Sequence, residues 1–199
     1  DRVREQLSIK QLVSLPSSFV VKWCPDGKYV AVGYTRTSGS NFAIYQFDQG
    51  TQTLNLVLQG DQNGPNTSFG GSFVVGLDWS PCGNYLAVGS GLVNGSFDVG
   101  IYQFDDNALS LMATGLATTN VDQGDSLVWE VDWSVNGKYV LASINDDVSA
   151  GDFSTVVFEF NPASSQLTLL DRAIYGIGLG ISGTRFTGKW SADNSRIAV

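Results

Sequence analysis

The side chains that could do chemistry in this chain are carboxylates, lysines, tryptophans and two cysteines, because its 199 residues include no histidine. Histidine is the commonest general base and the commonest metal ligand of proteins. Its absence excludes Ser-His-Asp catalysis, Cys-His catalysis and His-based zinc sites built from this chain alone. Cys24 and Cys82 are too few for a disulfide scaffold, and a catalytic thiol would lack its base.

Four charged residues each stand directly before a tryptophan, and the pairs recur at intervals of about 56 residues. The pairs are Lys22–Trp23, Asp78–Trp79, Asp132–Trp133 and Lys189–Trp190. We predict that the four charges lie at one level of successive strands, so that each lysine can pair with an aspartate of a neighbouring unit. The alternative is a ligand site that lines a channel.

Each of these tryptophans belongs to a longer repeated motif. The copies are VKWCPDGKYVAVG from Val21, LDWSPCGNYLAVG from Leu77, VDWSVNGKYVLAS from Val131 and GKWSADNSRIAV from Gly188. A second feature follows in phase, as IYQFD at Ile44–Asp48 and Ile101–Asp105 and as VFEFN at Val157–Asn161. A Leu-rich run then closes each unit. Three features in register over three periods indicate a repeat architecture.

Each repeat is predicted to hold four antiparallel strands joined by turns. Val75, Leu77 and Trp79 alternate with polar or small residues, which is strand periodicity. The turn after the tryptophan places glycine or asparagine where the backbone needs positive φ, and a tyrosine opens the next strand in three copies. These positions are Gly27, Gly83, Gly137 and Asn194 in the turns, and Tyr29, Tyr85 and Tyr139 after them. No segment shows a sustained helical pattern.

The pattern W-S-P-x-G-x-Y-L-A-V-G, seen from Trp79, resembles the inner-strand signature of WD-repeat and TolB-type propellers. The resemblance covers most of the chain. It implies an all-β fold, a β-propeller built from four-stranded antiparallel blades of about 56 residues. The Gly-His and terminal Trp-Asp dipeptides of typical WD repeats are absent, and the period is longer than that of the usual WD blade. A sandwich or barrel is the other architecture with many short strands.

The repeats predict a single propeller domain or fragment over residues 1–199. Its expected parts are an outer strand at 7–15, blade 1 at 16–60, blade 2 at 71–115, blade 3 at 126–172 and the first half of blade 4 at 184–199. The ring is therefore expected to be incomplete in this chain. Either a longer polypeptide or a second copy would complete it, since an open ring exposes sheet edges and apolar faces.

The composition favours a protein partner. The net charge of −8 and the lack of clustered Lys and Arg argue against nucleic acid, and no apolar run is long enough for membrane insertion. We expect no cofactor, no metal site and a homo-oligomer or other protein complex. The main hypothesis is a non-catalytic scaffold for protein–protein interaction or self-assembly, such as a filament subunit, and not an enzyme. The alternative is a carbohydrate-binding or hydrolytic propeller that uses Asp and Trp in the channel or loops.

Trp129 is the candidate for a binding face, because it has no counterpart in the other repeats; packing between blades is its other interpretation. Three loop features stay open. They are the G-x-G-x-x-G run at Gly178, Gly180 and Gly183, the carboxylates Asp146, Asp147 and Asp152 as calcium ligands, and the glycosylation sequons at Asn66 and Asn94. The first lacks the following helix of a nucleotide site, and the second matches no dedicated calcium loop.

Overall fold

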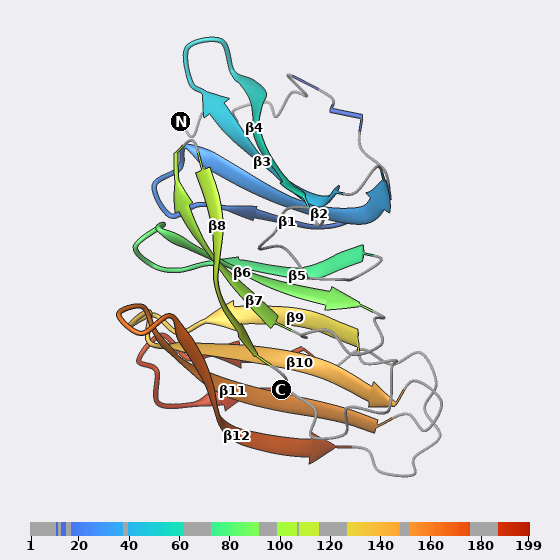
Figure 1. Ribbon diagram of the computed structural model, residues 1–199, viewed down its shortest axis with the longest axis vertical. Coiled ribbons are helices and arrows are strands. Elements are labelled where there is room, and N and C mark those ends of the chain that lie inside the picture. The colour runs from blue at the N-terminus through green and yellow to red at the C-terminus, as the bar shows by residue number, and fades with distance from the viewer. Residues whose placement is uncertain are drawn as a thin grey trace, which may run out of the picture.

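The computed structural model describes residues 11, 13–14, 17–37, 40–61, 73–91, 99–106, 108–115, 127–147, 152–175 and 187–199. The regular elements of this part are all strands (Figure 1). They are β1 (Ser18–Trp23), β2 (Tyr29–Thr37), β3 (Ser40–Asp48), β4 (Thr53–Asp61), β5 (Phe73–Trp79), β6 (Tyr85–Gly91), β7 (Val99–Asp105), β8 (Ala108–Gly115), β9 (Leu127–Trp133), β10 (Tyr139–Asp147), β11 (Asp152–Asn161), β12 (Gln166–Tyr175), β13 (Lys189–Trp190) and β14 (Ile197–Ala198). No described helix is long and apolar enough to cross a membrane.

The strands form blades, each an antiparallel sheet in which every strand pairs with the next along the chain. Blade 1 is β1–β4, blade 2 is β5–β8 and blade 3 is β9–β12, while β13 and β14 form a separate pair. Figure 1 shows the three blades stacked side by side, with the tight turns at one edge. The all-β prediction, the four-stranded blades and the incomplete ring are confirmed.

The turn after each tryptophan explains why the first two strands of a blade fold back on each other. Gly27, Gly83 and Gly137 have φ values of 72°, 76° and 71°, and Asn194 has a φ of 58°. These values lie in the left-handed region, which Gly enters without strain and Asn tolerates best among other residues. The positive φ that the sequence predicts at these positions is confirmed.

The core lies mainly between blades, where aromatic rings of neighbouring blades interlock. The ring of Phe104 in β7 packs edge-on against Tyr29 of blade 1 at 4.9 Å and against Trp79 of its own blade at 5.3 Å. The next interface repeats this contact with Tyr85 and Phe160 at 5.1 Å. Edge-to-face pairs of this kind add stability beyond their buried area. The repeated tyrosine of one blade therefore anchors the blade that follows.

The face of blade 1 that points away from blade 2 shows what an open ring leaves uncovered. Trp23 is 53% exposed, although Trp79 at the same repeat position is 4% exposed. Val21, on the same side of β1, is also exposed. Of the outer strand expected at 7–15, only residues 11 and 13–14 are described, and the domain boundaries stay a prediction.

Candidate functional site

The first strands of the blades bring the repeated charged residues together. β1 lies next to β5, and β5 lies next to β9. Lys22 Nζ lies 3.4 Å from Asp78 Oδ1, and Lys189 Nζ lies 2.7 Å from Asp132 Oδ1. Both pairs join neighbouring units, as the sequence predicted. Lys22, Asp78, Asp132 and Lys189 thus form a row of charges across the first strands of successive blades, which we call the inner edge.

Each aspartate of this row also holds the backbone of the next unit. Asp78 Oδ2 accepts the main-chain N–H of Trp133 at 2.8 Å, and Asp132 Oδ2 accepts that of Trp190 at 2.9 Å. Burial raises the pKa of Asp78, while Lys22 and the Trp133 N–H act in the opposite direction. The sequence did not reveal these bonds, because main-chain acceptors and donors leave no mark on residue type.

Glu130 is a functional candidate that sequence reasoning missed. Its Oε1 lies 2.6 Å from Lys189 Nζ, so that one ammonium is shared by Glu130 and Asp132. Burial lowers the pKa of Lys189, but hydrogen bonds to Asp132 and Glu130 outweigh this and raise it above its usual range. Strand periodicity was the available signal, since Glu130 stands two residues before Asp132 and shares its face of β9.

A cavity of about 210 Å³ opens beside this row. It is lined by Phe19, Val20, Lys22, Val75, Gly76, Leu77, Trp129, Glu130 and Thr187. The walls are mostly apolar, and the two charged side chains are Lys22 and Glu130. Trp129 is partly buried and forms part of the wall. A small apolar hollow with a few polar groups is the usual form of a small-molecule site.

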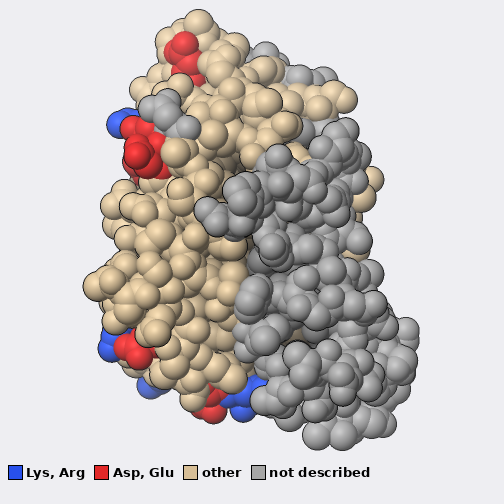
Figure 2. Space-filling view, viewed as in Figure 1, with Lys and Arg blue, Asp and Glu red and all other residues tan. Residues whose placement is uncertain are grey.

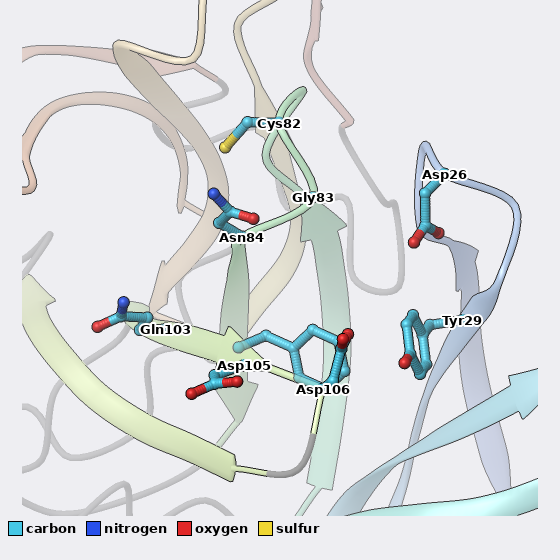
Figure 3. Close-up of a pocket in the computed structure, with 9 residues that line it drawn as sticks. Asp26, Tyr29, Cys82, Gly83, Asn84, Gln103, Asp105 and Asp106 are labelled. Atoms are coloured by element: carbon cyan, nitrogen blue, oxygen red, sulfur yellow. The ribbon is translucent and has the colours of Figure 1, made fainter.

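A second hollow, of about 360 Å³, lies between the turns of blades 1 and 2 (Figure 3). Its polar lining includes Asp26, Asp105, Asp106 and Cys82. Burial, with help from Asp106, raises the pKa of Tyr29 to about 12. In the described part of the chain no three Asp, Glu or Cys side chains converge as metal ligands would.

The two cysteines are placed differently, because Cys82 lines the second hollow and Cys24 does not. Cys24 is buried, Cys82 is exposed, and no disulfide joins them. The G-x-G-x-x-G run and both sequons lie outside the described residues, as do the side chains of the three candidate calcium ligands. The repeat tryptophans, glycines and tyrosines occupy the blade turns and interfaces described above, and their assignment as functional positions stays a prediction.

Comparison with known proteins places the architecture. No family model matches the chain, and no curated protein does. A candidate 6-phosphogluconolactonase from Bacteroides uniformis has a TM-score of 0.66 at 18% identity, over 92% of this chain and 46% of that one. The periplasmic gluconolactonase of Pseudomonas aeruginosa has a TM-score of 0.57 at 19% identity, over 78% of this chain and 40% of that one. The Swd1 β-propeller domain of Myceliophteria thermophila has a TM-score of 0.54 at 14% identity, over 88% of this chain and 47% of that one.

The fold is a β-propeller, and the chain spans less than half the length of each of these neighbours. The hypothesis of a non-catalytic scaffold, and with it the expectation that the protein is not an enzyme, is contradicted by the lactonase neighbours. That hypothesis gave too much weight to the missing histidine. Carboxylates and lysines can also transfer protons and stabilise charge.

Proposed function

We propose that this chain is part of a hydrolytic, carbohydrate-processing propeller that opens a sugar lactone. The observation that carries the proposal is the cavity in which Lys22, Glu130 and Trp129 share one small hollow at the inner edge of the blades. The names of the lactonase neighbours support the reaction type. The hollow is smaller than the roughly 300–1,000 Å³ of a typical ligand pocket, which suits one ring and not a polymer.

The roles in this proposal follow from the chemistry of each side chain. Glu130 acts as general base and takes a proton from the water that attacks the lactone carbonyl carbon. The Lys22 ammonium stabilises the negative charge that forms on the carbonyl oxygen. Its 3.4 Å contact with Asp78 is longer than both contacts of Lys189, which leaves Lys22 the freer of the two lysines.

Two further residues position the reacting groups. Lys189 holds the Glu130 carboxylate at 2.6 Å and fixes its direction. The indole of Trp129 offers an apolar surface against which the C–H face of a sugar ring can pack. Both roles concern orientation, which is where much of the rate of a hydrolase originates.

The repeat motif supports a finer assignment as well. We propose that the blades belong to the WD-repeat-like or TolB-type group, on the strength of the W-S-P-x-G-x-Y-L-A-V-G pattern and the tight turns with positive φ. The expected protein partner or second copy stays a prediction, as does the exclusion of nucleic acid.

Hydrolysis of glucono-1,5-lactone by the protein that contains this chain tests the proposal, with acid release followed in a pH-stat. Glu130→Gln should lower kcat by at least about 100-fold, the usual contribution of a general base. The matched control is Glu159→Gln, because Glu159 is another ion-paired glutamate of blade 3. Its Oε1 lies 2.8 Å from Lys138 Nζ, and it is not part of the cavity wall. The kcat of this control variant should equal the wild-type value. No hydrolysis above the spontaneous rate, or equal losses in the two variants, would refute the proposal.

A further inference from the structure

Lys22 and Glu130 of the cavity wall balance each other, but the row of charges to which they belong does not. Two lysines, Lys22 and Lys189, stand against three carboxylates, those of Asp78, Glu130 and Asp132. The inner edge therefore carries one net negative charge among its described residues. The whole chain is acidic as well, with a net charge of −8. An anion that enters this hollow meets repulsion from both sources.

Both lysines already face carboxylates. Lys189 lies within 2.7 Å of two carboxylates, and Lys22 has one at 3.4 Å. The fork of an arginine is the usual means of holding a phosphate. Neither described arginine side chain, Arg172 or Arg196, is part of the cavity wall. In Figure 2 the blue groups of the described surface lie beside red ones and form no broad basic patch.

The described wall also contains no helix N-terminus. Helix N-termini bind phosphate through their unpaired N–H groups. The wall residues belong to strands β1, β5 and β9 and to the segment before β13, and no described helix approaches them. Apart from Gly76 and Thr187, the neutral part of the wall is made of aliphatic and aromatic side chains, which match an uncharged ring.

From this charge pattern we infer that the cavity takes an uncharged sugar lactone and discriminates against its phosphorylated form. The inference rests on the proposed function and names the substrate class of that same site. A phosphate monoester carries a charge of about −1.5 to −2 at pH 7, so repulsion acts on it and not on the neutral lactone. We expect kcat/KM for the neutral lactone to be at least about tenfold higher.

The same charges favour departure of the product. Water adds its oxygen to the carbonyl carbon, the acyl–oxygen bond of the ring breaks, and a proton moves to the ring oxygen, which becomes a hydroxyl. The resulting carboxylic acid then loses its proton to solvent, because its pKa lies far below 7. A neutral substrate is thus converted into an anion beside a net negative charge. Gluconate should accordingly be a weak competitive inhibitor.

The test compares glucono-1,5-lactone with its 6-phosphate on the full-length protein. Ionic strengths of about 0.01 M and about 1 M give Debye lengths of about 30 Å and about 3 Å. Preference for the neutral lactone should be large at low salt and shrink at high salt. Equal or better turnover of the phosphorylated lactone would overturn the inference and leave the proposed function standing.

When no turnover is seen, a binding experiment tests the preference for a neutral ligand separately from the hydrolytic activity. Calorimetry with the unreactive gluconolactam and its 6-phosphate reports binding without hydrolysis. Tighter binding of the neutral lactam, by at least tenfold, supports the inference even if the hydrolytic proposal fails. Tighter binding of the phosphorylated lactam, or no binding of the neutral one, overturns the inference.

Two variants test the electrostatic cause. Asp78→Asn removes one negative charge from the inner edge and should narrow the preference for the neutral ligand. Asp48→Asn removes one from a distant turn, where Asp48 accepts the N–H groups of Gly50 and Thr51, and should keep the wild-type preference. An unchanged preference in Asp78→Asn, with both variants folded, would contradict an electrostatic origin.

Discussion

Two tryptophans at the same repeat position differ in one hydrogen bond, which makes them a matched pair for a stability experiment. Trp79 and Trp133 are 4% and 5% exposed, and each packs edge-on against a phenylalanine of its own blade. Trp79 Nε1 donates to the Lys22 carbonyl at 3.2 Å. Nε1 of Trp133 is buried, and no acceptor reaches it among the described residues.

Replacing each tryptophan with phenylalanine should therefore have unequal effects. Both changes remove the same ring area, so this loss cancels in the comparison. Trp79→Phe also loses a hydrogen bond worth about 1 kcal/mol, whereas Trp133→Phe removes a buried unpaired donor that costs about 1–3 kcal/mol. The free energy of unfolding should thus be lower in Trp79→Phe than in Trp133→Phe, by about 2–4 kcal/mol.

Urea unfolding followed by circular dichroism measures this difference. With a slope of about 2 kcal/mol/M, the two midpoints should differ by about 1–2 M. The slopes themselves should match, because both variants expose similar surface on unfolding. Equal midpoints, or a lower midpoint for Trp133→Phe, would refute the assignment of the Nε1 bond as the deciding contact.

Three further outcomes can be checked. Gly83→Ala should lower the free energy of unfolding by at least about 1–2 kcal/mol, measured in urea, because its φ is 76° and a Cβ there would lie 3.0 Å from Cys24 Sγ. Ellman's reagent should modify Cys82 quickly and Cys24 slowly, since burial raises the pKa of the Cys24 thiol to about 12; equal rates would contradict this. In a carboxyl NMR titration Asp193, whose pKa hydrogen bonds lower to about 2, should ionise well below Asp78, whose pKa burial raises. The folded state favours ionised Asp193, so the stability that this group contributes should be lost as the pH falls from about 4 towards 2. The folded state favours protonated Asp78, so the stability that this group contributes should be lost as the pH rises through its pKa.

Part of the candidate site was predictable from the sequence. Lys22, Asp78, Asp132 and Lys189 stand at one repeat position, and the period alone placed them on neighbouring strands and paired them correctly. Glu130 could have been added from the two-residue period of a strand. The main-chain hydrogen bonds of Asp78 and Asp132 could not be predicted, because N–H groups are common to nearly all residue types.

The amino-acid sequence by itself determined the local architecture of this protein. Strand alternation, the glycine and asparagine turns and the in-phase repeats depend on neighbouring residues, so they define the blades without knowledge of the whole. Tertiary structure decided what the blades enclose. Only the stacking of one blade on another brings Lys22 of β1, Trp129 and Glu130 of β9 and Thr187 to one hollow, since residues more than a hundred positions apart meet there through packing and not through spacing.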